Sequence, residues 1–182
     1  MTPKKYQPIA KRKLKKIYSE VKTEWTSIRG DKNIYSPRVD LAVGPFAIDR
    51  RYENEYDDLM RESKIFIKSL IANHNENLRS FDLELEDNYF EKLFDFNRNS
   101  RCLLCIEIEN KVSRKHLIGG LVNASALGRV GILIPWTPEK LKAFMKLRNY
   151  LKFLGQVDKN TFKTDNILIL TKDQFDGCLR QI

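Results

Sequence analysis

The chain has 182 residues, of which 42% are hydrophobic and 31% charged, and its formal net charge is +9. This composition is typical of one soluble globular domain, and no apolar run is long enough to cross a bilayer. The basic balance favours an anionic partner, of which nucleic acid is the commonest. The basic N-terminus is not followed by the apolar run of a secretory signal, so we expect a cytoplasmic protein without a membrane partner.

The first third of the chain predicts a basic tail, a helix and a hairpin. Residues 1–16 hold seven Lys or Arg and no acid, which favours a basic tail over residues 1–10. The basic stretch over residues 4–16 could serve as a non-specific nucleic-acid arm. A helix is predicted over 10–29, because apolar residues recur at spacings of three and four: Leu14, Ile17, Val21, Trp25 and Ile28. Residues 37–49 predict a β-hairpin with a Gly-Pro pair at its turn.

An acidic, helical segment follows. Two helices are predicted over 52–73 and 84–97, and together they form an inserted helical pair over about residues 52–98. Residues 50–101 hold twelve acids against nine bases, so this insert is not expected to face an anionic partner. Docking of a protein partner and a dimer contact both remain open for it.

The second half predicts alternating strands and helices. A strand over 102–110, a helix from an N-cap at Ser113 to about Leu127, and a strand over 129–135 make a βαβ unit, whose two strands should be parallel. Three further elements follow: a helix that begins at Thr137-Pro138 and runs to about 154, a strand over 166–171, and a helix over 172–181. The order predicts an α/β fold with a mixed central sheet.

Acidic and basic side chains gather at predicted strand ends. Side chains alternate along a strand, so Glu107, Glu109 and Lys111 share one face at the end of an apolar run. Buried charge is costly unless it is paired or binds a metal. Asp40 lies in the hairpin after Ser36-Pro37, with Asp49 as a reserve candidate. Glu20 and Glu24 lie on the predicted first helix.

These residues resemble the PD-(D/E)-x-K nuclease superfamily. The matching residues are Pro37 and Asp40 in "SPRVD" and Glu109-Asn110-Lys111, and the predicted order of helix, hairpin, strand, helix and strand is also similar, over roughly residues 10–135. The resemblance implies a restriction-endonuclease-like three-layer sandwich, so that residues 1–182 form a single nuclease-like domain. It further implies Mg²⁺-dependent (or Mn²⁺-dependent) endonuclease action on DNA, and a homodimer for cutting both strands.

The resemblance also implies roles for the residues. Asp40, Glu107 and Glu109 would bind the metal, since Mg²⁺ prefers oxygen ligands. Lys111 would orient the attacking water, and Glu20 or Glu24 would assist from the first helix. Two registers remain open, because Glu107-x-Glu109 fits the apolar run better than Glu109-x-Lys111 and would replace the lysine by an acid. The inserted helices also lengthen the stretch between the two acidic motifs beyond the usual pattern.

Rival interpretations remain open as well. An isolated Glu-x-Lys is common at solvated strand ends. The fold could carry a catalytically inactive nucleic-acid-binding module, or a protein-interaction module that uses the acidic insert. Five cations of the helix from 138 lie off its apolar face and could contact phosphates, although a solvated face is the usual role of such a run: Lys140, Lys142, Lys146, Arg148 and Lys152.

Overall fold

The computed structural model describes residues 1–181 except 29–32, 86–87, 111–112 and 160–162. The described residues form one five-stranded sheet in the order β1-β2-β3-β4-β5. The strands are β1 (Val21–Thr26), β2 (Arg38–Val43), β3 (Cys102–Glu109), β4 (Gly128–Pro135) and β5 (Ile167–Ile169). The helices are α1 (Pro3–Leu14), α2 (Glu53–Glu62), α3 (Lys64–Ser80), α4 (Tyr89–Lys92), α5 (Arg114–Leu127), α6 (Pro138–Gln156) and α7 (Lys172–Cys178).

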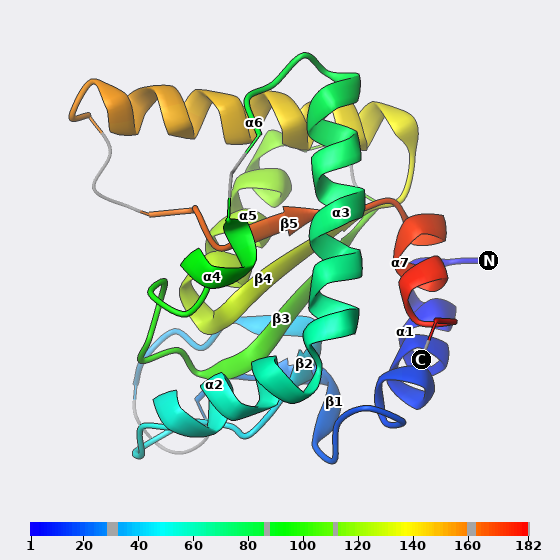
Figure 1. Cartoon of the computed structure of the whole chain (residues 1–182), viewed down its shortest axis with the longest axis vertical. Coiled ribbons are helices and arrows are strands. Elements are labelled where there is room, and N and C mark those ends of the chain that lie inside the picture. Colours follow the sequence, from blue (N-terminus) through cyan, green and yellow to red (C-terminus); the bar gives the residue numbers. More distant parts are fainter. Residues whose placement is uncertain (29–32, 86–87, 111–112, 160–162, 182) are drawn as a thin grey trace.

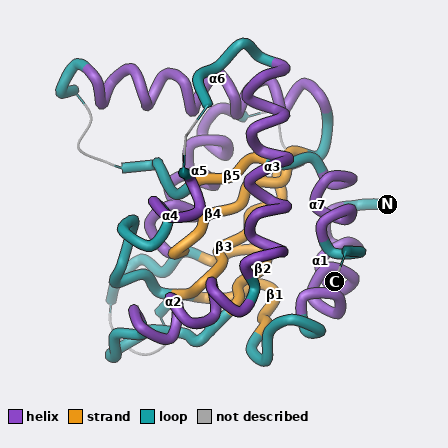
Figure 2. The backbone as a smooth tube through the Cα atoms, viewed as in Figure 1, coloured by secondary structure: helices purple, strands orange, loops and turns teal. Residues whose placement is uncertain are grey.

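The sheet is mixed and is covered by helices on both faces (Figures 1 and 2). The pairs β1–β2 and β2–β3 are antiparallel, whereas the pairs β3–β4 and β4–β5 are parallel. Two apolar clusters fill the space on either side. One contains residues of α1, α2, α3, α4 and α7, and the other is built mainly from α5 and α6. The predicted α/β fold with a mixed sheet is confirmed, and this layering is compatible with a three-layer sandwich.

The parallel unit β3–α5–β4 agrees with its prediction within about two residues at each end, as does the start of α6. All eight residues of β4 are buried, which suits a strand covered on both faces. The predicted strand over 166–171 and the predicted last helix are both shorter in the structure, as β5 and α7.

The N-terminal prediction is wrong. Residues 3–14 form helix α1 rather than a basic tail, since Thr2 caps it, Pro3 occupies its first turn, and Tyr6, Ala10 and Leu14 pack into the core. Of the predicted helix 10–29, only residues 10–14 are helical, as the end of α1, and residues 21–26 form strand β1. Its sequence VKTEWT is rich in β-branched and aromatic side chains, which favour a strand, and it pairs with β2 along its length.

The predicted hairpin over 37–49 is also wrong. β2 is antiparallel both to β1, which precedes it, and to β3, which follows after the helices α2, α3 and α4. Residues 44–49 form no strand, so β2 has no hairpin partner directly after it. After β2, Gly44 and Pro45 lead the chain out of the sheet. A Cβ atom on Gly44 would lie 3.0 Å from Cβ of Glu20, so glycine permits this close approach.

The inserted helices form part of the core. The predicted helix 52–73 divides at Ser63 into α2 and the longer α3, and the predicted helix 84–97 is reduced to the single turn of α4. The fully buried Arg129 of β4 fastens this region: its guanidinium donates to the carbonyls of Phe94 (2.8 Å) and Glu53 (3.1 Å) and to Asp57 (2.5 Å).

Candidate functional site

Strands β2 and β3 separate where their acidic side chains lie. The β2–β3 ladder includes the pair Leu41–Ile106 and goes no further toward Asp40, while β3 stays paired with β4 as far as Glu109. Extending the register places Asp40 opposite Glu107. The backbone N–H of Ile108 donates to Oδ2 of Asp40 at 2.7 Å. A carboxylate therefore takes the place of a backbone carbonyl at the point where the two strands diverge.

Strand β1 is irregular at the same position. Thr23 pairs with Leu41 and Trp25 with Val39, so Glu24 lies opposite Asp40. Glu24 has φ of 48°, in the left-handed region that a non-glycine residue rarely adopts. In a regular strand Val21 and Trp25, four residues apart, would point to the same face of the sheet. Here Val21 packs on the α1 side and Trp25 on the α5–α6 side, because the backbone turns at Glu24. Strained backbone of this kind clusters at functional sites.

Helices from both layers contribute a side-chain amide to the acidic pair. Gln7 of α1 is 5% exposed and donates from Nε2 to Oδ1 of Asp40 at 2.7 Å. Asn123 of α5 donates from Nδ2 to Oε1 of Glu107 at 3.4 Å. We call Gln7, Asp40, Glu107 and Asn123 the carboxylate site. Each acidic side chain in it is held by a neutral donor, and within the described part of the chain neither forms an ion pair with a basic side chain.

Burial and mutual repulsion perturb both acids. Burial raises the pKa of Glu107 to about 8, and the charge of Asp40 adds to this, while hydrogen bonds from Asn123 and the Asp40 backbone oppose it. Burial likewise raises the pKa of Asp40 to about 6 against the hydrogen bond from Ile108, with the charges of Glu24 and Glu109 adding to the shift. Pairs of titratable groups perturbed in this way are typical of functional sites.

The structure brings together most of the predicted acidic residues. The charge of Asp40 raises the pKa of Glu107, and the charges of Glu24 and Glu109 raise the pKa of Asp40, so these four carboxyl groups lie near one another. Glu24 also pairs with Arg38 at 3.0 Å. Its predicted place on a helix is wrong, but its predicted proximity to the sheet acids holds.

Three candidates differ from their prediction or lie outside it. Glu20 precedes β1, and its carbonyl accepts from Gly44 N at the far end of the strand. It is four residues from Glu24, about 13 Å along extended backbone, so the helical proximity predicted for the two is wrong. The reserve candidate Asp49 is exposed after β2. Lys111 lies outside the described residues.

Gln7 is the site residue that sequence reasoning missed. The signal was present: Thr-Pro at positions 2–3 is a helix start, and Tyr6, Ala10 and Leu14 recur at a spacing of four. Assigning these residues to a tail removed Gln7 from consideration. Asn123, by contrast, lies on a helix that was predicted correctly.

The donor set fits a hard divalent cation. Among the described residues, no three His, Cys, Asp or Glu side chains already converge as metal ligands. Mg²⁺ keeps several of its waters and uses only one or two protein carboxylates, and Asp40 and Glu107 supply two. A cation between them would offset the repulsion that raises their pKa values.

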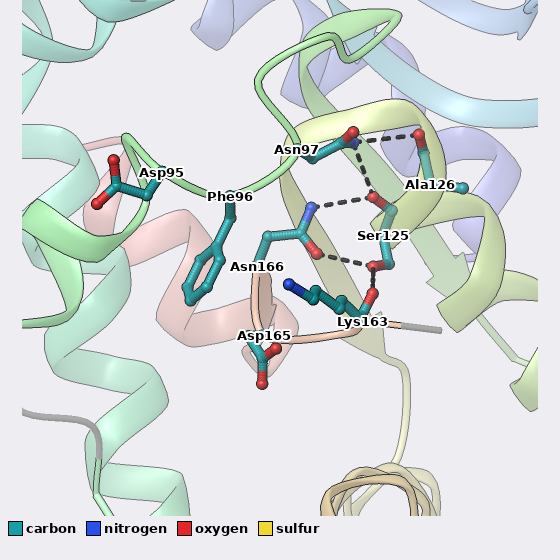
Figure 3. Close-up of a pocket in the computed structure, with 8 residues that line it drawn as sticks. All are labelled: Asp95, Phe96, Asn97, Ser125, Ala126, Lys163, Asp165 and Asn166. Atoms are coloured by element: carbon teal, nitrogen blue, oxygen red, sulfur yellow. Dashed lines mark hydrogen bonds between the residues drawn. The ribbon is translucent and has the colours of Figure 1, made fainter. Parts of the chain in front are cut away.

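A separate cavity of about 370 Å³ lies at the end of α5 (Figure 3). Its amides serve the backbone: Asn97 donates to the carbonyls of Ser125, Ala126 and Gly128, and Asn166 donates to two of the same carbonyls. The hydroxyl of Ser125 bonds Oδ1 of Asn166. These side chains tie the end of α5 to its neighbouring loops, which is a structural role, so we place the functional site at the carboxylate pair.

Comparison with protein-family models, with curated proteins and with solved structures found no match to this chain. Among the described helices, none combines the length and the apolar composition that crossing a membrane requires.

Proposed function

We propose that this chain is a metal-dependent endonuclease that hydrolyses phosphodiester bonds in DNA, on a restriction-endonuclease-like fold. The observation that carries the proposal is the pair of interacting, half-buried carboxyl groups, Asp40 and Glu107, at the point where the β2–β3 ladder stops. The order α1, β1–β2, β3, α5, β4 supports it, because the resemblance expects a helix, a hairpin, a strand, a helix and a strand. The acids lie on the second and third strands of that order.

Each residue of the site has a distinct task. Asp40 and Glu107 would hold Mg²⁺ or Mn²⁺, with Gln7 and Asn123 fixing the orientation of their carboxyl groups. The bound cation supplies a water of lowered pKa and offsets negative charge on the phosphoryl oxygens. Glu109, beside this pair, would accept a proton from the attacking water or join the metal ligands. The proposed role of Lys111, orienting that water, keeps its basis in the sequence motif alone.

The decisive experiment measures nicking of a supercoiled plasmid with Mg²⁺ or Mn²⁺, beside EDTA. Wild type is compared with Asp40→Asn and Glu107→Gln, which keep shape but remove a carboxylate. Metal-dependent nicking by wild type is expected to fall at least a hundredfold in both variants, because each removes one of two metal ligands.

Asp49→Asn is the matched control, because Asp49 is an exposed acid outside the site. It should retain wild-type activity. Nicking that survives in both site variants, or that is insensitive to EDTA, would refute the assignment of these residues. An absence of nicking together with an absence of metal binding would leave the catalytically inactive binding module. Cutting both strands of a duplex calls for two sites, so a homodimer belongs to the same proposal, and sedimentation with and without DNA tests it.

A further inference from the structure

Helix α1 has two chemically different sides. At 100° per residue, six cations fall within one arc of about 140° and form what we call the basic side of α1: Lys4, Lys5, Lys11, Arg12, Lys15 and the adjoining Lys16. The other side carries Tyr6, Ala10 and Leu14, which are buried in the core, and Gln7 lies at the border between the two sides, about 40° from Lys11 and against the carboxylate site.

The basic side is open to solvent. Five of its cations are exposed and Lys11 is half-buried. Within the described part of the chain, none of the six forms an ion pair with an acidic side chain. The seventh cation, Lys13, points elsewhere and pairs with Asp176 of α7 at 2.9 Å. Uncompensated cations on one side of a rigid element provide a site for polyanions.

The position of α1 is fixed relative to the carboxylate site. Asp176 accepts from the hydroxyl of Tyr6 at 3.1 Å as well as from Lys13, which fastens α1 to α7 beside it (Figure 1). Lys4 and Lys11 stand at i−3 and i+4 from Gln7 and are therefore its nearest neighbours along the helix surface. Two of the cations that could hold phosphates thus lie about one turn from the residue that touches Asp40.

Helix α6, the other basic helix, is differently arranged. Lys140 and Arg148 are buried, and Lys152 pairs with Glu84 at 2.8 Å. The exposed surface of α6 also carries Tyr150 and Phe153. The prediction that its cations share one solvated face is wrong for Lys140 and Arg148, because both are buried.

We propose that the basic side of α1 binds the phosphates of duplex DNA and delivers the backbone to the carboxylate site. This inference rests on the proposed nuclease function and names the surface that holds its substrate. The helix is about 18 Å long, which equals roughly five base-pair steps. Its basic side displays no aromatic ring on which an unstacked base could lie, so it suits a stacked duplex rather than a single strand.

The test removes the two cations beside Gln7. Lys4→Gln/Lys11→Gln is compared with Lys142→Gln/Lys146→Gln on exposed positions of α6, both in an Asp40→Asn background that prevents cleavage. Binding of a fluorescent 20-base-pair duplex is followed by anisotropy at several salt concentrations. The logarithm of the association constant falls with the logarithm of the salt concentration, and losing two phosphate contacts should make this dependence shallower by about two. Binding should weaken roughly ten- to a hundredfold near 0.1 M salt. The α6 variant should keep the parent slope.

The outcomes separate this inference from the nuclease proposal. An unchanged slope in the α1 variant, or an equal loss in the α6 variant, overturns the assignment to α1 even if plasmid nicking is intact in otherwise wild-type protein. Binding of single-stranded DNA as tight as the duplex also overturns it. An α1-specific slope change supports the inference even if wild-type protein cleaves nothing, because the binding assay does not depend on chemistry.

Discussion

Replacing Glu107 by Gln should make the metal-free protein more stable while removing its activity. The folded state raises the pKa of Glu107 from 4.5 to about 8, so it holds this proton more tightly than the unfolded chain does. The stability contributed by the protonated group is present below pH 4.5 and is lost as pH rises through 8. Glutamine cannot ionise and can still accept the hydrogen bond from Asn123, so it avoids that loss.

The gain in stability on replacing Glu107 by Gln follows from the change in the pKa of Glu107 on folding. At about 1.4 kcal/mol per pKa unit, the variant should be more stable than wild type by up to about 1 kcal/mol at pH 5, 3 at pH 7 and 5 at pH 9. These are upper limits, because the half-buried Glu107 keeps some contact with solvent. Urea denaturation in EDTA at the three pH values measures the difference directly.

The exposed Asp49→Asn serves as the control and should show no difference that grows with pH. Adding Mg²⁺ at pH 9 should stabilise wild type, by about 2.7 kcal/mol at a hundred times its dissociation constant, and stabilise the variant much less. If Glu107→Gln is no more stable than wild type at pH 9, or if its advantage does not grow with pH, the argument that this site holds repelled carboxylates is refuted.

Three other outcomes are expected. Mg²⁺ binding should release about two protons at pH 5, about one at pH 7 and almost none at pH 9, because the pKa values of Asp40 and Glu107 are about 6 and 8. Calorimetry in buffers of different ionisation enthalpy counts the released protons, and zero release at pH 7 contradicts the assignment. Gln7→Ala should raise the Mg²⁺ concentration for half-maximal nicking about ten- to a hundredfold with kcat less affected, and an unchanged Mg²⁺ titration would exclude a positioning role. Arg129→Met should cost up to about 3–5 kcal/mol of unfolding free energy, because among the described residues it leaves the buried Asp57 with only a longer contact to Arg98 (3.7 Å), and adding Asp57→Leu should recover most of it. A loss that persists in the double variant would mean that packing, not charge, dominates.

The parallel half of the fold could be predicted because its local signals agree with its tertiary environment. β3 and β4 are continuous apolar runs, and α6 begins with Thr137 and Pro138 in their favoured positions. The N-terminal half could not be predicted in the same way. The apolar spacing between Leu14 and Ile28 fits one helix, yet the chain there contains the end of α1, a turn and β1. Whether residues 21–26 form a helix or a strand is decided by their pairing with β2, which lies more than ten residues further along the chain.

The same contrast explains the candidate site. Glu107 could be predicted as a candidate because a carboxylate at the end of an apolar strand is costly and needs a reason, and Asp40 because Pro37 precedes it as in the motif of the resemblance. Gln7 and Asn123 could not be identified as their partners, since an amide has no such signature and its role depends on which helix lies above which strand.

The irregular backbone at the site links these observations. Glu24 adopts a left-handed conformation, the β2–β3 ladder stops beside Asp40, and the Asp40 carboxylate replaces a backbone acceptor, all opposite Glu107. A sheet built only for stability would continue its ladder and place apolar residues at these positions, as it does at Val43, Leu41 and Ile106. The backbone of β1 and the β2–β3 ladder instead depart from regular geometry where two half-buried acids lie near each other. Hydrogen bonds from Gln7, Ile108 and Asn123 hold these acids but do not remove their mutual repulsion, which is the physical reason for expecting a cation and an anionic substrate to complete the site.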